Sequence, residues 1–400
     1  MSDGLNHKIN VAFMFKDINE WTGGLNYFKN LFSALKINNN FRINPVLVLN
    51  KSDDNSKIKK YYSDLAQIIE PEVLFKDKSL LNKLNRKTLK LFKKSFFYDA
   101  YFKFHNINVV SHSNFCNSTS DLKKINWIPD FQHIHLPEMF SDSEIQVRGN
   151  HYKLLAEHSD IIILSSYDAL EDYKRFSPDY AYKGRVLHFV SIPNAKVYEK
   201  NNSIKEQIYS KYNLGSKFFY MPNQFWKHKN HKVVFEAVNR LKKLDLNVQV
   251  VFTGHLNDYR NNEHITELQD YIKQNKLEDN IKILGLIEYE EVLFLMRNCI
   301  SLINPSLFEG WNTMVEEAKS IGKNIILSNL NVHREQAPPE GIFFDPKNSE
   351  QLAEILKDKW QNSLGGPDYE LEVKAKASLN SRIFEFAETY QNYVKEVLAK

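Results

Sequence analysis

Two glutamates eight positions apart, Glu309 and Glu317, are the residues of this chain best placed to do chemistry. Glu309 lies in a predicted loop. Glu317 lies in the short helix that follows, which we expect to begin with a capping box over 313–316 and to end at Gly322. A helix start exposes unpaired N–H groups and the positive end of the helix dipole, which attract phosphate. The two carboxylates can then bind hydroxyls on either side of a diphosphate. Alternatively, both are solvated groups that only stabilise the dipole.

The flanking sequence favours the first interpretation. PSLFEGW precedes the helix, and EEAKSIGKNIILSN runs through it into a strand. With these flanks the spacing resembles the E-x7-E signature of the retaining glycosyltransferases of family 4 (glycosyl transferases group 1), which have the two-domain GT-B fold. The resemblance implies that Glu309 contacts the donor sugar and acts in catalysis, and that Glu317 binds the ribose hydroxyls. The donor-binding residues it implies between them are Gly310, Trp311, Asn312 and Thr313.

A glycine pair near the N-terminus is a second candidate phosphate site. Trp21-Thr22-Gly23-Gly24 follows the first predicted strand and precedes a helix, and glycines let the backbone approach a ligand closely. In the family that the chain resembles, a glycine-rich loop here lies near the donor phosphates, which implies donor binding by Gly23 and Gly24. The alternative is a tight strand-to-helix turn without a ligand.

A basic turn within 219–230 occupies the place where the family has a Gly-Arg pair and then a lysine. Lys229 matches that lysine, which implies that it neutralises the departing diphosphate. Gln224 or Asn223 stands where the arginine is expected, and a neutral amide cannot make the bidentate charged contact of arginine. We expect Lys227 to compensate, with Gln224 still touching the donor. The alternative is a solvated basic turn.

The segment 125–140 follows another predicted sheet edge and is rich in histidine, aspartate and aromatic residues. Laid beside the His-Asp pair of many family members, Asp130 matches the aspartate and Pro129 replaces the histidine, so no histidine role carries over. Asp130 stays a catalytic candidate, and His133 and His135 stay candidates for contact with the acceptor or the sugar. The alternative is that they make capping and core hydrogen bonds in a loop between domains.

The resemblance also limits the cofactors and partners. The family uses no bound divalent ion, so we expect no metal site and no cofactor beyond a UDP- or GDP-linked sugar as co-substrate. The expected partners are this nucleotide-sugar donor and a glycan or lipid-linked acceptor. A net charge of +4 does not call for nucleic acid, and no nucleic-acid-binding motif is present.

A basic stretch over 80–97 is a candidate membrane contact. It has no acidic residue, and its apolar residues fall roughly on one helical stripe, as in helices that lie on anionic lipid. The alternative is a domain helix with an apolar inner face. The basic residues are Lys83, Arg86, Lys87, Lys90, Lys93 and Lys94.

Composition describes a globular chain. With 400 residues, 42% of them hydrophobic and 26% charged, there is material for two domains of ~150–200 residues. No apolar run approaches the ~20 residues of a membrane span, and the N-terminus lacks the apolar core of a signal peptide. Cys116 and Cys299 alone cannot form a disulfide framework. We therefore expect a cytoplasmic protein, with peripheral contact at the inner face of the cell membrane.

The pattern of short apolar runs predicts an α/β fold with two doubly wound parallel sheets. The expected strands are 9–15, 46–49, 108–111 and 161–164, then 218–221, 248–253, 281–284, 301–303, 324–327 and 342–344. Because the pattern restarts after 192–194, we expect an N-terminal acceptor-side domain over 1–195 and a nucleotide-sugar-binding domain over 196–375. The resemblance implies a GT-B arrangement of two facing Rossmann-like domains, with a C-terminal crossover helix over 376–400 packed on the first.

These observations predict a hexosyltransferase-type enzyme that moves a sugar, with retention, from a nucleoside diphosphate sugar to an acceptor hydroxyl. By analogy, the acceptor belongs to polysaccharide or lipid-linked glycan assembly at a bacterial surface, such as O-antigen, lipopolysaccharide or capsule. Two alternatives stay open: a catalytically idle glycosyltransferase-like scaffold, suggested by the missing histidine and arginine, and a GT-B sugar-nucleotide epimerase. A dehydrogenase is disfavoured because Gly23-Gly24 is not G-x-G-x-x-G.

Overall fold

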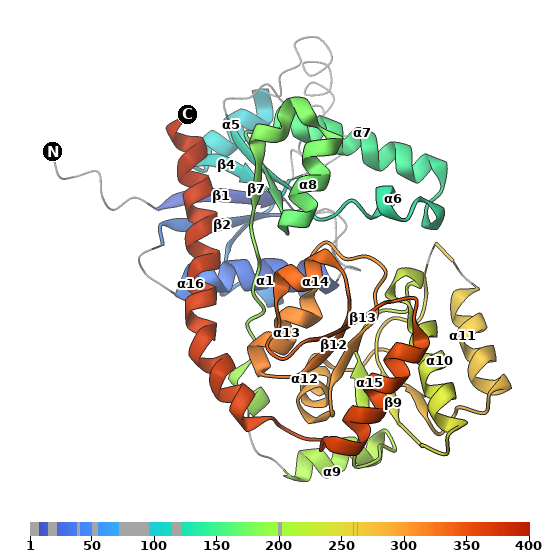
Figure 1. Ribbon diagram of the computed structural model, residues 1–400. Coiled ribbons are helices and arrows are strands. Elements are labelled where there is room, and N and C mark those ends of the chain that lie inside the picture. The colour runs from blue at the N-terminus through green and yellow to red at the C-terminus, as the bar shows by residue number, and fades with distance from the viewer. Residues whose placement is uncertain are drawn as a thin grey trace. The chain divides into compact units, whose positions relative to one another are not determined.

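The computed structural model (Figure 1) describes residues 8–14, 22–37, 41–49, 55–71, 96–113, 122–198, 202–258, 260–261 and 263–400. The chain divides into two compact units. The first unit comprises 1–131, 142–191 and 381–400, and the second comprises 132–141 and 192–380. The sequence breaks predicted at 195/196 and 375/376 thus stand beside changes of unit at 191/192 and 380/381.

The first unit is built on a seven-stranded parallel sheet with the order β3-β2-β1-β4-β5-β6-β7. Its first six strands follow the Rossmann order, in which the chain reverses direction across the sheet between β1 and β4. Four of the strands were predicted. The bounds are β1 (Ile9–Met14), β2 (Ile43–Val48), β3 (Gln67–Ile69), β4 (Ile107–Ser111), β5 (Lys123–Ile128), β6 (Ile161–Leu164) and β7 (Gly184–Val186).

Three strands of this sheet, β3, β5 and β7, were missed. β3 and β7 have only three residues each, and β5 begins with two lysines, so none of them shows the long apolar run of a buried strand. The stretch 125–140 therefore does not merely follow a strand, because its first residues form β5.

Helices of the first unit are α1 (Thr22–Ile37), α2 (Ser56–Tyr62), α5 (Phe96–Phe104), α7 (Asp142–His158) and α8 (Tyr167–Phe176). The C-terminal helix α16 (Tyr369–Ala399, red in Figure 1) begins earlier than the predicted 376, and its last part belongs to this unit. There the Tyr390 hydroxyl donates to Ser111 Oγ at 2.8 Å, and Arg185 pairs with Glu396 at 2.7 Å. These bonds anchor the end of the chain to the first sheet.

The second unit is built on a six-stranded parallel sheet, and all of its predicted strands are present. The order β10-β9-β8-β11-β12-β13 again follows the Rossmann pattern, with the reversal between β8 and β11. The bounds are β8 (Phe219–Met221), β9 (Val250–Phe252), β10 (Ile281–Ile283), β11 (Leu302–Asn304), β12 (Ile325–Ser328) and β13 (Ile342–Phe344).

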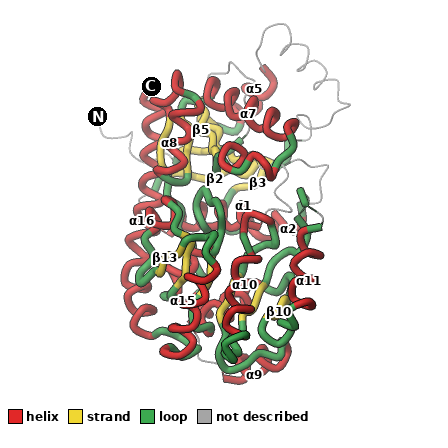
Figure 2. The backbone as a smooth tube through the Cα atoms, turned by 45° about the vertical axis from the view of Figure 1, so that its right-hand side comes forward, coloured by secondary structure: helices red, strands yellow, loops and turns green. Residues whose placement is uncertain are grey.

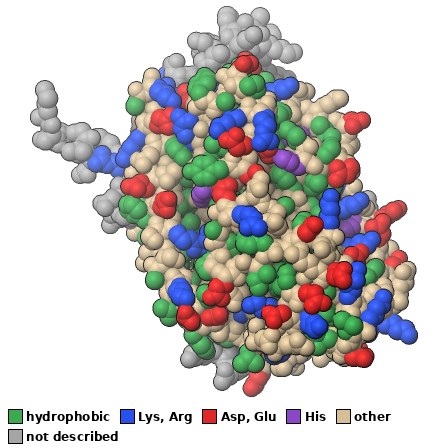
Figure 3. Space-filling model, viewed as in Figure 1, with side chains coloured by type: hydrophobic (Ala, Val, Ile, Leu, Met, Phe, Trp, Pro, Cys, Tyr) green, Lys and Arg blue, Asp and Glu red, His purple; other side chains and the backbone are tan. Residues whose placement is uncertain are grey.

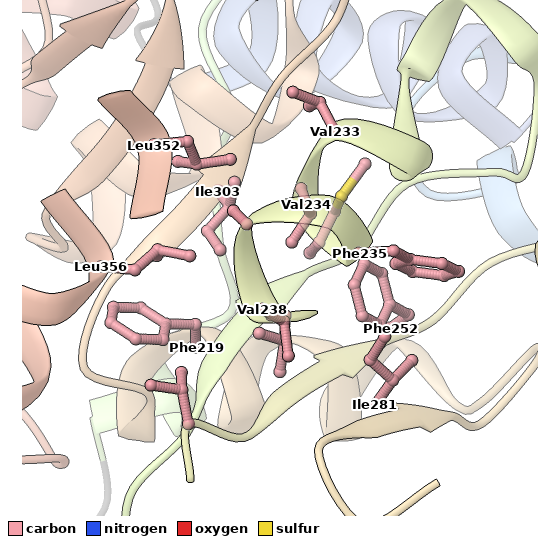
Figure 4. Close-up of a cluster of buried hydrophobic side chains, with 14 of the residues drawn as sticks. Phe219, Val233, Val234, Phe235, Val238, Phe252, Ile281, Ile303, Leu352 and Leu356 are labelled. Carbon is pink, nitrogen blue, oxygen red and sulfur yellow. The ribbon is translucent and has the colours of Figure 1, made fainter. Parts of the chain in front are cut away.

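Helices cover both faces of this second sheet, as Figure 2 shows. Alternate residues of β8 point to opposite faces, so Phe219 packs into one core and Tyr220 into the other. The core drawn in Figure 4 joins Phe219 to Val234 and Leu356 from the helices on its face. The helices are α10 (His231–Lys242), α11 (His264–Gln274) and α15 (Ser349–Asn362) on that side, and α9 (Asn202–Lys211), α12 (Tyr289–Asn298) and α13 (Thr313–Ile321) on the other.

On the face shown in Figure 3, basic and acidic side chains are interspersed rather than gathered by sign. No helix among the described residues is long and apolar enough to cross a membrane. The predicted membrane contact over 80–97 lies outside the described residues except for its last two, which begin α5.

Candidate functional site

The candidate site lies at the carboxyl ends of the strands of the second unit. Open α/β sheets bind ligands where the strand order reverses, here beyond the ends of β8 and β11. The turn after β8 contains the 3-10 helix η5 (Lys227–Lys229), and the loop after β11 contains Glu309. The topology therefore brings together two segments that are 80 residues apart in sequence.

Lys229 and Glu309 form the central ion pair of this edge. Lys229 Nζ lies 2.6 Å from Glu309 Oε1, and the two side chains are only 14% and 9% exposed. Ser306, which is fully buried, donates its hydroxyl to the same oxygen at 2.6 Å. Glu309 Oε2 receives no hydrogen bond from any described residue. Since an ammonium has three N–H donors, this pairing leaves Lys229 two donors and Glu309 one oxygen for a ligand.

Hydrogen bonds to main-chain carbonyls hold the two loops in place. The Leu307 N–H donates to the carbonyl of His228 at 2.8 Å. Asn230 adopts the left-handed conformation with φ 57°, and its amide donates to the carbonyls of Pro305 and Pro346 at 3.0 and 2.8 Å. These bonds fix the approach of Lys229 to Glu309 before any ligand binds.

The start of α13 differs from the predicted capping box. The N-cap is Asn312, whose side chain accepts from the N–H of Val315 at 3.2 Å, so Thr313 is the first helical residue. The predicted end at Gly322 is confirmed, with φ 72°. The Asn312 N–H is bound by Gln336 Oε1 at 3.1 Å, so it is not open to phosphate in this structure. By position, the N–H groups of Thr313 and Met314 have no partner inside the helix.

Glu317 lies buried inside α13 and accepts a hydrogen bond from the hydroxyl of Tyr289 at 2.7 Å. Burial raises the pKa of Glu317 to about 7, and the bond from Tyr289 offsets only part of that rise. A carboxyl group with a pKa near 7 is costly to bury when no ligand binds it. It is therefore the kind of group that marks a functional site.

His333 is a further buried polar group beside this edge. It belongs to α14 (Asn331–Gln336), and its Nδ1 lies 2.9 Å from the carbonyl of Ser328, so Nδ1 carries the proton and Nε2 is an acceptor. Burial lowers the pKa of His333, although the charge of Glu309 acts in the opposite direction. The imidazole is therefore neutral at physiological pH.

Comparison with known protein families finds a match for part of the chain. Residues 204–372 match the family model Glycosyl transferases group 1. We call this matched region the group 1 domain below. No curated protein sequence matches the chain.

Solved structures resemble nearly the whole chain. HepE of Anabaena, solved with UDP and glucose, is 14% identical with a TM-score of 0.68, over 98% of this chain and 100% of HepE. A glycosyltransferase from Rickettsia africae is 15% identical with a TM-score of 0.68, over 98% and 99%. The lipopolysaccharide outer core galactosyltransferase WaaB is 15% identical with a TM-score of 0.58, over 98% and 99%. The chain thus has the GT-B fold.

The group 1 domain has no arginine at the position of Gln224, which is half-buried. Lys227 is exposed, and its N–H donates to the buried carboxylate of Asp258 at 3.0 Å. The same carboxylate pairs with Arg260 Nε at 3.1 Å. The guanidinium of Arg260, from the segment after β9, therefore lies beside the basic turn. The prediction from residues 219–230 did not include it.

The remaining predicted residues are divided between the units. In the first unit Gly23 and Gly24 lie in the first turn of α1, not in a loop before it, and Asp130 lies 3.7 Å from Arg148 Nη1. His133 and His135 lie in α6 (Gln132–His135), which belongs to the second unit. The ring of His135 stacks on that of Phe308, next to Glu309, with centroids 5.0 Å apart. His135 therefore contacts the loop that carries Glu309.

Four residues of the group 1 domain that shape the site were not predicted: Ser306, Tyr289, His333 and Gln336. Their partners are fixed by tertiary structure, so spacing along the chain gave no signal for Tyr289. A weak signal existed for the other three, since Ser306 is three residues from Glu309, and His333 and Gln336 follow the next strand. Among the described residues, no group of three or more His, Cys, Asp or Glu side chains could hold a metal ion.

Proposed function

We propose that the protein is a retaining glycosyltransferase that transfers a sugar from a nucleoside diphosphate sugar to an acceptor hydroxyl. The observation that carries this proposal is the cluster of Lys229, Glu309 and Ser306 at the sheet edge, within the same group 1 domain as the buried Glu317. Glu317 would accept hydrogen bonds from the ribose, and the free oxygen of Glu309 would accept one from the donor sugar. The diphosphate would lie between them at the start of α13.

The chemistry that these residues support is stabilisation of a leaving group. As the bond between the anomeric carbon and the phosphate oxygen breaks, negative charge grows on the β-phosphate. The two remaining N–H donors of Lys229 and the amides of Thr313 and Met314 would stabilise it, each such donor contributing roughly 3–4 kcal/mol. No divalent ion enters this proposal.

Retention of configuration is proposed to follow a same-face route. The acceptor oxygen bonds to the anomeric carbon on the side from which the diphosphate departs, and the proton of the acceptor hydroxyl passes to the departing phosphate oxygen. The free Glu309 oxygen would contact the sugar rather than attack it, because Oε1 is held by Lys229 and Ser306. Gly23, Gly24, Lys227, Gln224 and Asp130 stay predicted contacts whose roles await test.

The donor and acceptor classes rest on the similar structures. HepE was solved with UDP and glucose, and WaaB is a galactosyltransferase of the lipopolysaccharide outer core. We therefore propose a UDP- or GDP-linked hexose as donor, and an acceptor in surface glycan assembly. Contact with the inner face of the cell membrane is part of the proposal and needs its own flotation assay.

The first experiment is a thermal-shift panel with UDP, GDP, CDP and dTDP and their sugars, on wild type, Glu317→Ala and Glu309→Ala. A ligand at 100 times its Kd adds about 2.7 kcal/mol of stability. We expect one nucleotide to stabilise wild type and Glu309→Ala but not Glu317→Ala, because only the last variant loses the ribose acceptor. No shift with any nucleotide would support the idle scaffold instead.

Measurements of turnover distinguish the roles of the two glutamates. With the donor that binds, Glu309→Ala should lower kcat more than it weakens donor binding, whereas Glu317→Ala should do the reverse. The anomeric configuration of the product, read by NMR, tests retention directly. An inverted product, or conversion of the donor sugar without acceptor, would contradict the proposed reaction.

A further inference from the structure

We propose that Gln336 is a positioning residue for the donor diphosphate, a role that rests on the proposed function of the same site. Gln336 is the last residue of α14 and is only 1% exposed. It has no charge, and its side-chain amide is turned inward to the backbone of Asn312. It would act through the helix start that it holds.

The side chain of Gln336 binds both main-chain polar groups of Asn312. Oε1 accepts from the Asn312 N–H at 3.1 Å, and Nε2 donates to the Asn312 carbonyl at 3.0 Å. Nε2 also donates to Glu316 Oε1 at 3.1 Å. Only a side chain with a donor and an acceptor on one planar group can make this pair of bonds.

A closed ring of bonds holds Gln336 in turn. Lys319 Nζ donates to the main-chain carbonyl of Gln336 at 2.7 Å and to Glu316 Oε1 at 3.1 Å. Glu316 is 1% exposed, so these contacts are shielded from water. Shielding strengthens such bonds and fixes their geometry. Glu316 therefore sets the orientation of the Gln336 side-chain amide, and Lys319 holds both Glu316 and the Gln336 main chain.

The bonds from the Gln336 side chain to Asn312, which we call the clamp, fix the far end of the loop that carries Glu309. The near end is held where Ser306 binds Glu309 and where Leu307 binds the backbone of η5. Without Gln336, the first turn of α13 would keep the side-chain bond of Asn312 and its core packing but lose both bonds to the backbone of Asn312. Gln336 thus sets where the free amides point relative to Glu309.

The clamp also decides which amides a phosphate can use. Because the N–H of Asn312 is already bound, the diphosphate is left with the N–H groups of Thr313 and Met314. The nucleoside, held through Glu317 one turn further along the helix, does not depend on this arrangement. Gln336 should therefore affect diphosphate binding and leave nucleoside binding nearly unchanged.

The test compares Gln336→Met with Asn280→Leu, a matched loss of a buried amide. Asn280 is 3% exposed, and its Nδ2 donates to the Val248 carbonyl at 3.0 Å, at the opposite end of the second sheet. Kd is measured by calorimetry for UDP and UMP, and for GDP and GMP. We expect Gln336→Met to weaken binding of the diphosphate at least tenfold and of the monophosphate less than threefold, and Asn280→Leu to change neither.

Equal weakening of both ligands, or none, in Gln336→Met would overturn the inference while leaving the proposed function intact. If wild type binds none of the four nucleotides, the proposed function fails, and this inference fails with it. A second measurement needs no variant. In wild type, residue-resolved hydrogen exchange should show the Asn312 N–H protected without ligand, with the diphosphate adding protection at Thr313 and Met314 alone. Fast exchange at Asn312 would refute the clamp.

Discussion

Glu317 offers the sharpest test of the donor site, because its ionisation can be read in binding. Burial raises its pKa to about 7. Only the ionised carboxylate can accept from two ribose hydroxyls, so apparent affinity follows the ionised fraction. The ionised fraction is about 0.1 at pH 6 and about 0.9 at pH 8. The Kd for the donor should therefore be about tenfold higher at pH 6 than at pH 8.

The same pKa predicts the opposite effect on the free protein. A carboxyl whose pKa is higher in the folded state than its ordinary 4.5 stabilises the fold while protonated. This stabilisation is complete below pH 4.5 and is lost as the pH rises through 7, a difference of roughly 3 kcal/mol at 1.36 kcal/mol per pH unit. Glu317→Gln, which never ionises, should therefore unfold at a higher urea concentration than wild type at pH 8, while losing donor affinity.

The assay is calorimetry at pH 6, 7 and 8 with the nucleotide sugar that binds wild type. Each of its phosphates carries one ester bond and one anhydride bond, so neither phosphate titrates in this range. Tyr220, which is near Glu317, stays neutral because burial raises its pKa. Glu291→Gln, which removes a carboxylate paired with Lys211 at 2.7 Å, should keep the wild-type profile. A Kd independent of pH in wild type, or a tenfold change that persists in Glu317→Gln, would refute the reasoning.

Three further predictions concern the group 1 domain. Arg297→Met should destabilise it by about 3–5 kcal/mol in urea unfolding, because Arg297 pairs with Glu372 at 2.6 Å and both side chains are at most 7% exposed. Gly254→Ala should cost at least about 2 kcal/mol, because φ is 143° and the new Cβ would lie 2.4 Å from a backbone oxygen. Lys229→Met should lower kcat by about 100-fold or more with the fold intact, because the leaving phosphate loses its cation.

For each of these three predictions, one result would contradict it. The double variant Arg297→Met/Glu372→Leu should recover much of the lost stability, and no recovery would argue against a cost from the unpaired charge. Gly149→Ala meets no atom within 4 Å, and replacing a helical glycine should stabilise the first unit by about 0.5–1 kcal/mol, so an equal loss at both glycines would refute the steric argument. Unchanged turnover in Lys229→Met would remove that residue from the mechanism.

The sheet of the second unit could be predicted because its strands are short apolar runs separated by clear helix signals. The glycine stop at Gly322 was equally readable, since a left-handed cap favours glycine. The N-cap was misplaced by one residue, because Thr313 and Asn312 are both good caps and Gln336 helps to hold Asn312. That contact joins residues 24 apart in sequence. No local rule ranks two adjacent caps by a distant partner.

The polar partners of the candidate residues were the least predictable part. The spacing of the two glutamates, and the match of Lys229 to the lysine of the family that the chain resembles, predicted contacts to one ligand. The structure places Lys229 against Glu309 at 2.6 Å. The sequence did not indicate that Lys229 would donate one hydrogen bond to Glu309, or that Tyr289 would donate one to Glu317. These hydrogen-bond partners depend on which side chains the fold brings within about 3 Å of each other. They also change the chemistry that each residue can offer.

These pairings offset the charge of Lys229 at the candidate donor site. Lys229 is balanced by Glu309, and Gln224 stands where an arginine was expected. In the proposed site a diphosphate would therefore depend on the amides and the dipole of α13 as well as on the lysines, and amides act only when they point correctly. Orientation then limits affinity as much as charge does. For that reason we expect Gln336, an uncharged residue turned toward the backbone, to matter to donor binding as much as a lysine would.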